Sequence, residues 1–233
     1  MKFTRLLAVF CFAFCTFVLA LPVRAEMAGQ VLDAVGDVFA LRTSQIVRLN
    51  PGAAIESGDQ VHTGPESHVQ IRFTDWGMIS LRSNSDFVVD EYSYETRKGG
   101  HQRAFFSLLK GGIRSLTGMI GHSNRKNFSL RVATATVGIR GTHFTVLMCQ
   151  GECRNSDGSV ALDGLYGEIM EGRIAVSPYG GNDLEREFGA GEFFHLMNEN
   201  SVPAPLFSLP PFFRDKLDDQ ARSAGSAVAG IAP

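Results

Sequence analysis

Residues 68–74 read His-Val-Gln-Ile-Arg-Phe-Thr and alternate polar with apolar side chains without a break. A period of two residues places the Val, Ile and Phe side chains on one face, which is typical of a strand with one face buried. The turn residues Asp75-Trp76-Gly77 follow, and residues 78–82 then have the pattern of the returning strand. This segment predicts a β-hairpin and sets the fold class expected for the rest of the chain.

The strand pattern continues further along the chain. Residues 87–89 are apolar after a break at 84–85, and residues 144–148 alternate again. Residues 165–170 and 173–176 flank Glu171-Gly172, which predicts a second hairpin.

No convincing helical period interrupts these strands. The competing stretch, residues 104–109, is short and ends at Lys110-Gly111-Gly112, so it fits either a strand or a helix. Many short strands separated by turn signals predict one all-β domain, built as a sandwich, a roll or a short β-solenoid. The period alone does not choose among these three architectures.

The N-terminus predicts export. Residues 1–5 carry two positive charges and no acid, residues 6–21 form an apolar run, and short side chains at Val23 and Ala25 suit a signal peptidase. The run is shorter than the roughly 20 residues of a membrane-spanning helix, although an uncleaved anchor is the alternative. We predict a signal peptide over residues 1–25 and a mature periplasmic protein that is soluble, without a membrane span.

The charge argues against nucleic acid as a partner. The formal charge is −2 for the whole chain, and removal of residues 1–25 takes away three positive charges and no negative ones, which leaves −5. Nucleic-acid binding needs a clustered basic surface, whereas the pairs Arg97-Lys98 and Arg125-Lys126 have the pattern of solvated turns. The length of the mature chain suffices for a single core.

Cysteine usage agrees with export. Cys11 and Cys15 lie in the predicted signal peptide, which leaves Cys149 and Cys153 in the mature chain. In an oxidising compartment this pair can close a small loop as a disulfide. A metal site is the alternative, but it needs two further ligands that no nearby cysteine or histidine pair supplies. We therefore predict a disulfide and no metal.

A proline-rich tail, residues 202–233, follows the domain at residues 26–201. Its first part has four prolines among leucines and phenylalanines, at Pro203, Pro205, Pro210 and Pro211. Such a segment is extended, and it either packs back along the domain or docks on a partner. Residues 214–222 are long enough for one or two helical turns, and residues 223–233 have the composition of a disordered end.

Catalytic patterns are absent from the sequence. The six histidines stand singly, without metal-ligand spacing, at His62, His68, His101, His122, His143 and His195. Neither a nucleophile elbow nor a phosphate-binding loop is present. Glycosidases can hold their two acids far apart in sequence, so that class stays open, but nothing points to it. We predict a protein that is not an enzyme and needs no cofactor.

Five short motifs occur in order over residues 47–176. They are GDQVHTG at 58–64 followed by Ser67, IRFTDWG at 71–77, LRSNS at 81–85, LKGGIR at 109–114 and VATATVGIRGTHF at 132–144. Together they resemble the FecR domain, the periplasmic portion of the ferric-citrate sensor family. Two departures are Asp75-Trp76-Gly77, where the family more often has Asp-Gly-Ser, and Ala135, where proline is usual.

The resemblance implies an exported all-β domain that relays or holds contacts at the cell envelope. The matching motif residues are Gly58, Asp59, Thr63, Gly64, Asp75, Arg140, Gly141 and Thr142, and we expect them to hold the fold rather than a ligand. The family's sensors carry a cytoplasmic segment that engages a sigma factor, whereas only five residues precede the apolar run here. We therefore do not expect a direct anti-sigma role.

Physical chemistry suggests what several motif residues do. Asp59 suits a tight turn, where its side chain can cap backbone N–H groups. Arg140 lies in an apolar run, so its guanidinium needs a carboxylate or several carbonyls. Asp59 and Asp75 are the candidate carboxylates. Gly141 is expected to permit a close backbone approach, and Thr142 to bond an adjacent strand.

Two functions fit these observations. The first is a periplasmic interaction module that binds a protein partner of the cell envelope, in signalling or sensing. The alternative is a domain that binds a small molecule or a cell-wall glycan in a surface groove that includes Trp76. A partner module should expose an apolar patch or a mobile tail, whereas a ligand module should show a concave pocket with converging polar groups. The identity of the partner and the oligomeric state do not follow from the sequence.

Overall fold

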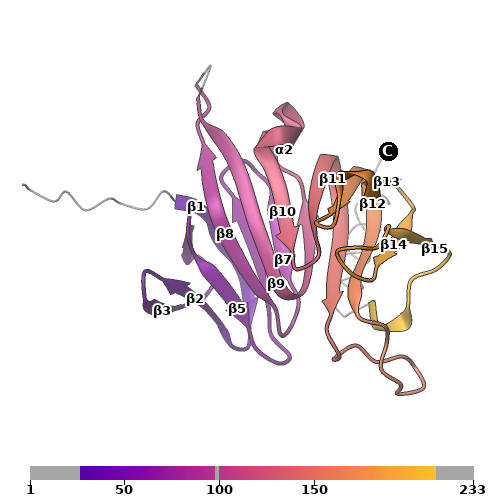
Figure 1. The fold of residues 1–233 in the computed structure, drawn as a ribbon. Coiled ribbons are helices and arrows are strands. Elements are labelled where there is room, and N and C mark those ends of the chain that lie inside the picture. The colour runs from indigo at the N-terminus through magenta and orange to yellow at the C-terminus, as the bar shows by residue number, and fades with distance from the viewer. Residues whose placement is uncertain (1–26, 98–99, 214–233) are drawn as a thin grey trace, which may run out of the picture.

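The computed structural model describes residues 27–97 and 100–213 (Figure 1). The predicted signal peptide and residues 214–233 of the tail lie outside the described residues, as do the side chains of Arg140 and Asn182. Nearly all of the regular structure in the described residues is strand, so the predicted all-β fold class is confirmed.

The described elements follow one another in this order: β1 (Met27–Val35), β2 (Val38–Arg42), β3 (Gln45–Arg48), β4 (Ala54–Glu56), β5 (Gln60–Thr63), β6 (His68–Phe73), β7 (Met78–Leu81), β8 (Asp86–Tyr94), β9 (Gln102–Leu116), α2 (Met119–Ser123), η1 (Arg125–Asn127), β10 (Phe128–Val132), β11 (Ala135–Cys149), β12 (Gly164–Pro178), η2 (Asn182–Leu184), β13 (Arg186–Gly189), β14 (Phe193–Leu196), β15 (Ala204–Leu206) and η3 (Pro211–Phe213). Among these described helices, none has the length and apolar character needed to cross a membrane.

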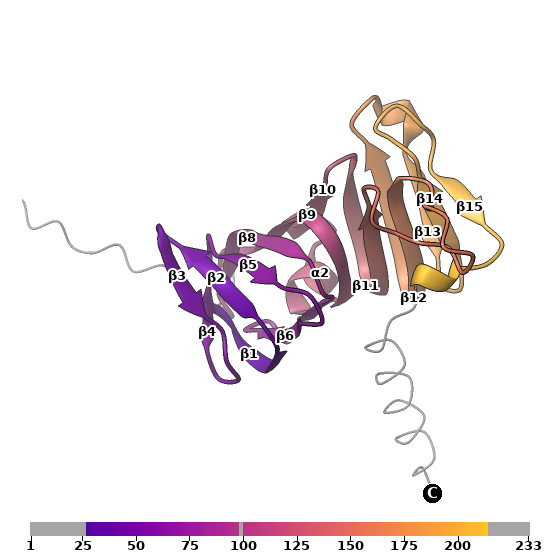
Figure 2. The same cartoon turned by 90° about the horizontal axis from the view of Figure 1, so that it is seen from below.

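The strands form one hydrogen-bonded sheet of fifteen strands. Its main path runs β15-β14-β12-β11-β10-β9-β7-β6-β1-β4, and a branch of β8, β5, β2 and β3 starts from β9. Figure 2 shows β1 to β6 and β8 curled together at one side of the molecule and β12 to β15 at the other, with β9 to β11 between them. The protein is therefore a single curled sheet.

The hairpin predicted over residues 68–82 is present. β6 pairs with β7 in antiparallel register, with Val69 opposite Leu81 and Ile71 opposite Ile79. The three apolar side chains of β6 are buried, as the period of two predicts.

β9 joins two regions of the sheet. Its first half pairs with β8 and β10, and its second half pairs with β7 and β11. The change of partners falls at Gly111, which has a φ of 78°. A Cβ at Gly111 would come 2.2 Å from the Ser85 Oγ, so this position requires glycine. The ambiguous stretch at residues 104–109 is therefore part of a strand.

The hairpin predicted at Glu171-Gly172 is wrong. Residues 165–170 and 173–176 belong to the single strand β12, and both stretches pair with β11. Gly172 has a φ of 73°, and the β11–β12 register shifts at this bend. A glycine of positive φ marks a bulge as well as a hairpin turn, so the sequence signal did not separate the two.

One hydrophobic core lies inside the curled sheet. At its centre the ring of Phe106 has centroid distances of 5.1 Å to Phe73, 5.3 Å to Phe87 and 5.7 Å to Phe128. Such clusters of buried aromatic rings contribute more than their buried area alone. The core therefore joins the N-terminal strands to β9 and β10.

Residues 202–213 pack on the domain, which is the first of the two alternatives for the tail. β15 pairs with β14 in antiparallel register. Phe213 is fully buried, and the guanidinium carbon of Arg82 lies 5.1 Å from the centroid of its ring. Phe207, between β15 and η3, is fully exposed.

Cys149 and Cys153 form the predicted disulfide, with their Cα atoms 5.6 Å apart. Both residues are buried in a second, smaller core that also contains Tyr166 and Phe213. The disulfide therefore closes the start of the β11–β12 loop next to the packed tail.

Candidate functional site

The family-motif residue Asp59 is fully buried and holds an ion pair. Its two carboxylate oxygens each accept a hydrogen bond from the Arg42 guanidinium at 2.7 Å, and Oδ2 also accepts one from the Glu56 N–H at 2.9 Å. The bond to Asp59 raises the pKa of Arg42. This pair fastens β2 to the turn between β4 and β5.

Thr63 and Gly64 lie where β5 meets the loop between β7 and β8. The Thr63 hydroxyl donates to the Arg82 carbonyl at 2.5 Å and accepts from the Ser85 N–H at 3.0 Å. The Gly64 carbonyl accepts a hydrogen bond from the Asn84 N–H of that loop at 3.1 Å. Gly58 has a φ of 91° in the turn before β5. These motif residues therefore make contacts within the fold.

Asp75 links the β6–β7 turn to α2. Its buried carboxylate accepts hydrogen bonds from the Tyr92 hydroxyl at 3.1 Å, the Gly77 N–H at 3.1 Å and the Ile120 N–H at 3.2 Å. Its carbonyl accepts from the Met119 N–H at 2.9 Å. Burial and the neighbouring Asp75 charge raise the pKa of Tyr92, which keeps its hydroxyl a neutral donor. The network fixes α2 on the sheet.

Thr142 fastens β11 to the end of β9. Its N–H donates to the Thr117 hydroxyl oxygen at 3.1 Å, and its carbonyl accepts from the Thr117 hydroxyl at 2.9 Å. The preceding Gly141 has a φ of 58°. A Cβ at Gly141 would lie 2.9 Å from two atoms of the His122 ring. Gly141 thus lets an imidazole from α2 pack directly on the bend of β11.

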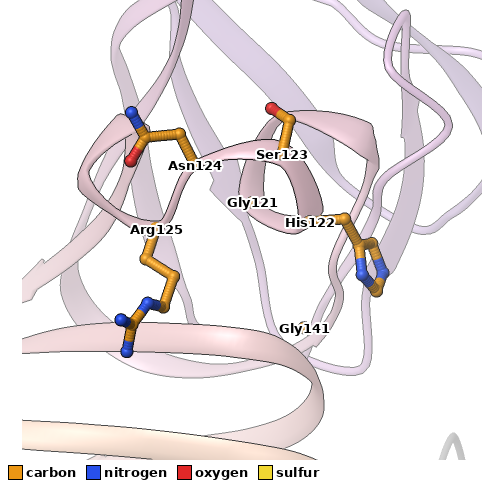
Figure 3. Close-up of a pocket in the computed structure, with 6 residues that line it drawn as sticks. All are labelled: Gly121, His122, Ser123, Asn124, Arg125 and Gly141. Atoms are coloured by element: carbon orange, nitrogen blue, oxygen red, sulfur yellow. The ribbon is translucent and has the colours of Figure 1, made fainter.

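An open hollow with a volume of about 480 Å³ lies between α2 and this bend. It is lined by Gly121, His122, Ser123, Asn124, Arg125 and Gly141. Figure 3 shows His122 and Arg125 extending on opposite sides of the hollow toward the ribbon below α2.

A second hollow of about 320 Å³ adjoins the first and shares Asn124 and Arg125 with it. It continues over Lys126, Gly138, Ile139, Ala175, Glu185 and Glu187. We call the two hollows together the α2 groove.

The α2 groove is basic along α2 and η1. His122, Arg125 and Lys126 are exposed, and their side chains make no hydrogen bond or ion pair with any residue of the described part of the chain. None of the six residues that line the first hollow is acidic, whereas Glu185 and Glu187 line the second hollow. Arg125 and Lys126 are unpaired cations beside an open hollow, and they favour an acidic partner, because they attract its charge without first breaking an ion pair.

His143 lies on β11 close to the groove. The Arg114 Nε donates to its Nε2 at 2.7 Å. Burial lowers the pKa of His143, and the Arg114 charge lowers it further. The ring is therefore a neutral acceptor at neutral pH, and this contact ties β11 to β9.

Trp76 stands apart from the groove. It is 70% exposed, has a φ of 68°, and the guanidinium carbon of Arg72 lies 5.5 Å from the centroid of its ring. Neither hollow of the α2 groove includes Trp76. The Trp76 ring therefore lies outside the α2 groove and stacks with the Arg72 guanidinium.

No metal centre is found in the region that the structure describes, where no three His, Cys, Asp or Glu residues are grouped to hold an ion. The metal alternative for Cys149 and Cys153 is overturned, since the two sulfurs are bonded to each other. The pairing of Arg140 with Asp59 or Asp75 stays a prediction, because the Arg140 side chain lies outside the described residues.

The sequence did not indicate the groove. Arg125-Lys126 has the pattern of a solvated turn, and the pair is indeed exposed on η1. His122 carried no signal at all, because a single histidine in a short helix has no distinctive spacing. Gly141 was expected to permit a close backbone approach, but that expectation named no groove.

The fold is all-β, and an open groove that is basic along α2 and η1 lies on its surface. Residues 59–170 match the family model described as FecR protein. Residues 59–170 therefore form a FecR domain, as the sequence motifs predict.

Two crystal structures of a candidate anti-sigma factor from Parabacteroides distasonis ATCC 8503 are similar at 13% identity and a TM-score of 0.45. The match covers 63% of this chain and 58% of those chains. No curated protein matches the chain.

Proposed function

We propose that this chain is an exported, non-enzymatic FecR-domain module that binds an acidic surface of a protein partner in the cell envelope, in signalling or sensing. The observation that carries the proposal is the trio of unpaired basic side chains, His122, Arg125 and Lys126, beside the open α2 groove.

The shape of the groove supports a protein partner more than a small molecule. Small-molecule pockets bury most of their ligand's surface and are lined mainly by apolar side chains. The first hollow is open and lined by polar residues and glycine. Protein interfaces, in contrast, are shallow surfaces in which arginine is enriched.

The periplasmic location in this proposal rests on the predicted signal peptide and on the family. It is tested by expressing the chain with a C-terminal tag and sequencing the N-terminus of the recovered protein. A mature chain that starts at Glu26 in the periplasmic fraction supports export. An intact N-terminus in the cytoplasm contradicts it.

The contact is tested by placing the photo-crosslinker p-benzoylphenylalanine at Asn124 in the tagged chain and irradiating intact cells of the native host. We expect an adduct with one envelope protein. Arg125→Glu should reduce its yield by about tenfold, since charge reversal opposes an acidic partner. Arg97→Glu is the matched control, because Arg97 is an exposed arginine outside the groove. Equal loss in both variants, or no adduct at all, contradicts the proposal.

A further inference from the structure

Four strands of the described part of the chain have a single neighbour in the sheet: β3, β4, β13 and β15. A strand edge of this kind presents N–H and C=O groups that can pair with another chain. Proteins therefore protect such edges with charges, prolines or covering side chains.

Three of these edges are protected. At β4 the Arg42 guanidinium donates to the Ala54 carbonyl at 3.0 Å. At β13 the Gly189 N–H donates to the Glu192 carboxylate. β15 contains Pro205, which has no N–H to offer. Each of these edges is therefore a poor template for a further strand.

The β3 edge lacks such protection. Its sequence, Gln45-Ile46-Val47-Arg48, contains no proline, and its one charge stands at the end. β3 is joined to β2 by the two-residue turn Thr43-Ser44, in which both residues have positive φ values of 43° and 69°. Two positive φ values are typical of the tight type I′ hairpin turn, which fixes the register of the two strands.

The register decides which backbone groups are free. Arg42 lies opposite Gln45 next to the turn, and the Leu49 N–H donates to the Val38 carbonyl at 3.0 Å. Hydrogen-bonded and non-bonded pairs alternate along an antiparallel ladder. The N–H and C=O groups of Ile46 and Arg48 therefore point away from β2, toward the open edge.

The side chains next to this edge add chemical selectivity. Ile46 is 75% exposed and lies opposite Leu41, which is 44% exposed, on the outer face of the hairpin. The Arg48 side chain is 64% exposed. It donates one hydrogen bond to the Gly36 carbonyl at 3.1 Å and has one long ion contact, 3.5 Å, to Asp37, which is 76% exposed. The edge thus offers two backbone hydrogen-bonding sites, an apolar patch and a cation.

We propose that the β3 edge binds an extended segment of a partner protein as an added strand, with an apolar side chain opposite Ile46 and a carboxylate opposite Arg48. The proposal rests on the proposed function only in that both require a protein partner. Strand addition takes its affinity from main-chain hydrogen bonds and its selectivity from alternate side chains.

A flexible segment fits this edge better than a second copy of the chain. A stable dimer buries at least about 1,200 Å², and a strand of four residues cannot supply that area. A short extended segment suits a small contact, because such segments serve in weak and reversible signalling interactions.

The test uses p-benzoylphenylalanine at Gln45, an exposed residue of β3, in the tagged chain in intact host cells. We expect an adduct with a peptide whose mapped sequence places an acid two residues from an apolar side chain. Ile46→Pro removes the outward N–H and should abolish the adduct, whereas Ile46→Val keeps the N–H and should retain it. Arg48→Glu, which leaves the hairpin backbone intact, should also reduce the yield, with Arg97→Glu as the unchanged control.

The outcomes separate this proposal from the proposed function. An adduct at Asn124 in the groove without one at Gln45 overturns the β3 proposal alone. A Gln45 adduct that survives both Ile46→Pro and Arg48→Glu overturns it as well. An adduct with the mass of two chains identifies a second copy instead of a partner segment. Absence of adducts at both positions overturns both proposals.

Discussion

Asp59 and Arg42 form a bidentate ion pair in which both oxygen–nitrogen distances are 2.7 Å. The carboxylate is fully buried, while the guanidinium keeps 23% of its side chain exposed. Because the pair also holds the Glu56 N–H, it replaces hydrogen bonds that water would otherwise supply to this turn. The family-motif aspartate therefore stabilises the corner where β2, β4 and β5 meet.

Replacement of Asp59 by alanine should lower the free energy of unfolding by about 3 kcal/mol, because the Glu56 N–H loses its acceptor and the Arg42 guanidinium loses two charged hydrogen bonds, keeping only those to Glu56 and the Ala54 carbonyl. Glu91→Ala is the control. It removes an ion pair with Arg103 whose two side chains are 48% and 50% exposed, which should cost less than about 1 kcal/mol. Urea unfolding of both variants measures the difference, and equal losses would argue against a stabilising role for the buried pair.

Tyr92→Phe should lower the free energy of unfolding by about 1–2 kcal/mol, because the Asp75 carboxylate and N–H lose a buried partner. Tyr94→Phe is the control, since the Tyr94 hydroxyl makes no hydrogen bond within the described residues. A loss as large in Tyr94→Phe would show that the effect is not specific to the Asp75 network.

We also expect Tyr92 to make the folded protein less stable at alkaline pH. The pKa of Tyr92 is raised in the folded protein, so the unfolded chain releases this proton first as the pH increases. Stability is therefore complete below the ordinary tyrosine pKa and falls above it. Tyr92→Phe should flatten that part of the stability profile, and an unchanged slope would contradict this assignment.

Parts of this fold follow directly from the residue pattern. The buried face of β6 could be predicted because one of its faces meets water and the other meets the core, which produces strict alternation. β11 was found at its alternating half, residues 144–148, for the same reason. Its other half carries Gly138 and Gly141, and the sequence assigned that half to a family motif without predicting a strand there.

Other parts depend on contacts that no local pattern encodes. Gly172 needs a positive φ whether β12 turns back or bends onward, and only its pairing with β11 decides between them. The sequence also could not identify Arg42 as the partner of Asp59, because the two residues become neighbours only when β2 lies beside β5. The α2 groove likewise exists only where α2, β11 and β12 meet.

His143 predicts a loss of stability in mild acid. Its pKa is lowered in the folded protein by burial and by Arg114, so below pH about 6.5 the unfolded chain takes up the proton first. Stability is complete above that pH and falls as the pH decreases toward the folded-state pKa. His143→Gln should reduce this dependence, as measured by thermal unfolding between neutral and acidic pH.

The control for His143→Gln is His101→Gln, which changes an exposed histidine on the β8–β9 connection. It should leave the acidic slope as it is in the native protein. If both variants changed the slope equally, the acid sensitivity would have to come from groups other than the His143–Arg114 contact.

Gly141→Ala should lower the free energy of unfolding by about 1–3 kcal/mol, since alanine would be held at a φ of 58° and its Cβ would meet the His122 ring at 2.9 Å. Gly138→Ala is the matched control on the same strand. It has no positive φ, and its Cβ would find its nearest neighbour at 3.9 Å, so it should be tolerated. Combining Gly141→Ala with His122→Ala removes the clash but not the strained φ, so it should recover only part of the loss. Full recovery would mean that the clash alone excludes a side chain at this motif position, and no recovery would mean that the backbone conformation alone does.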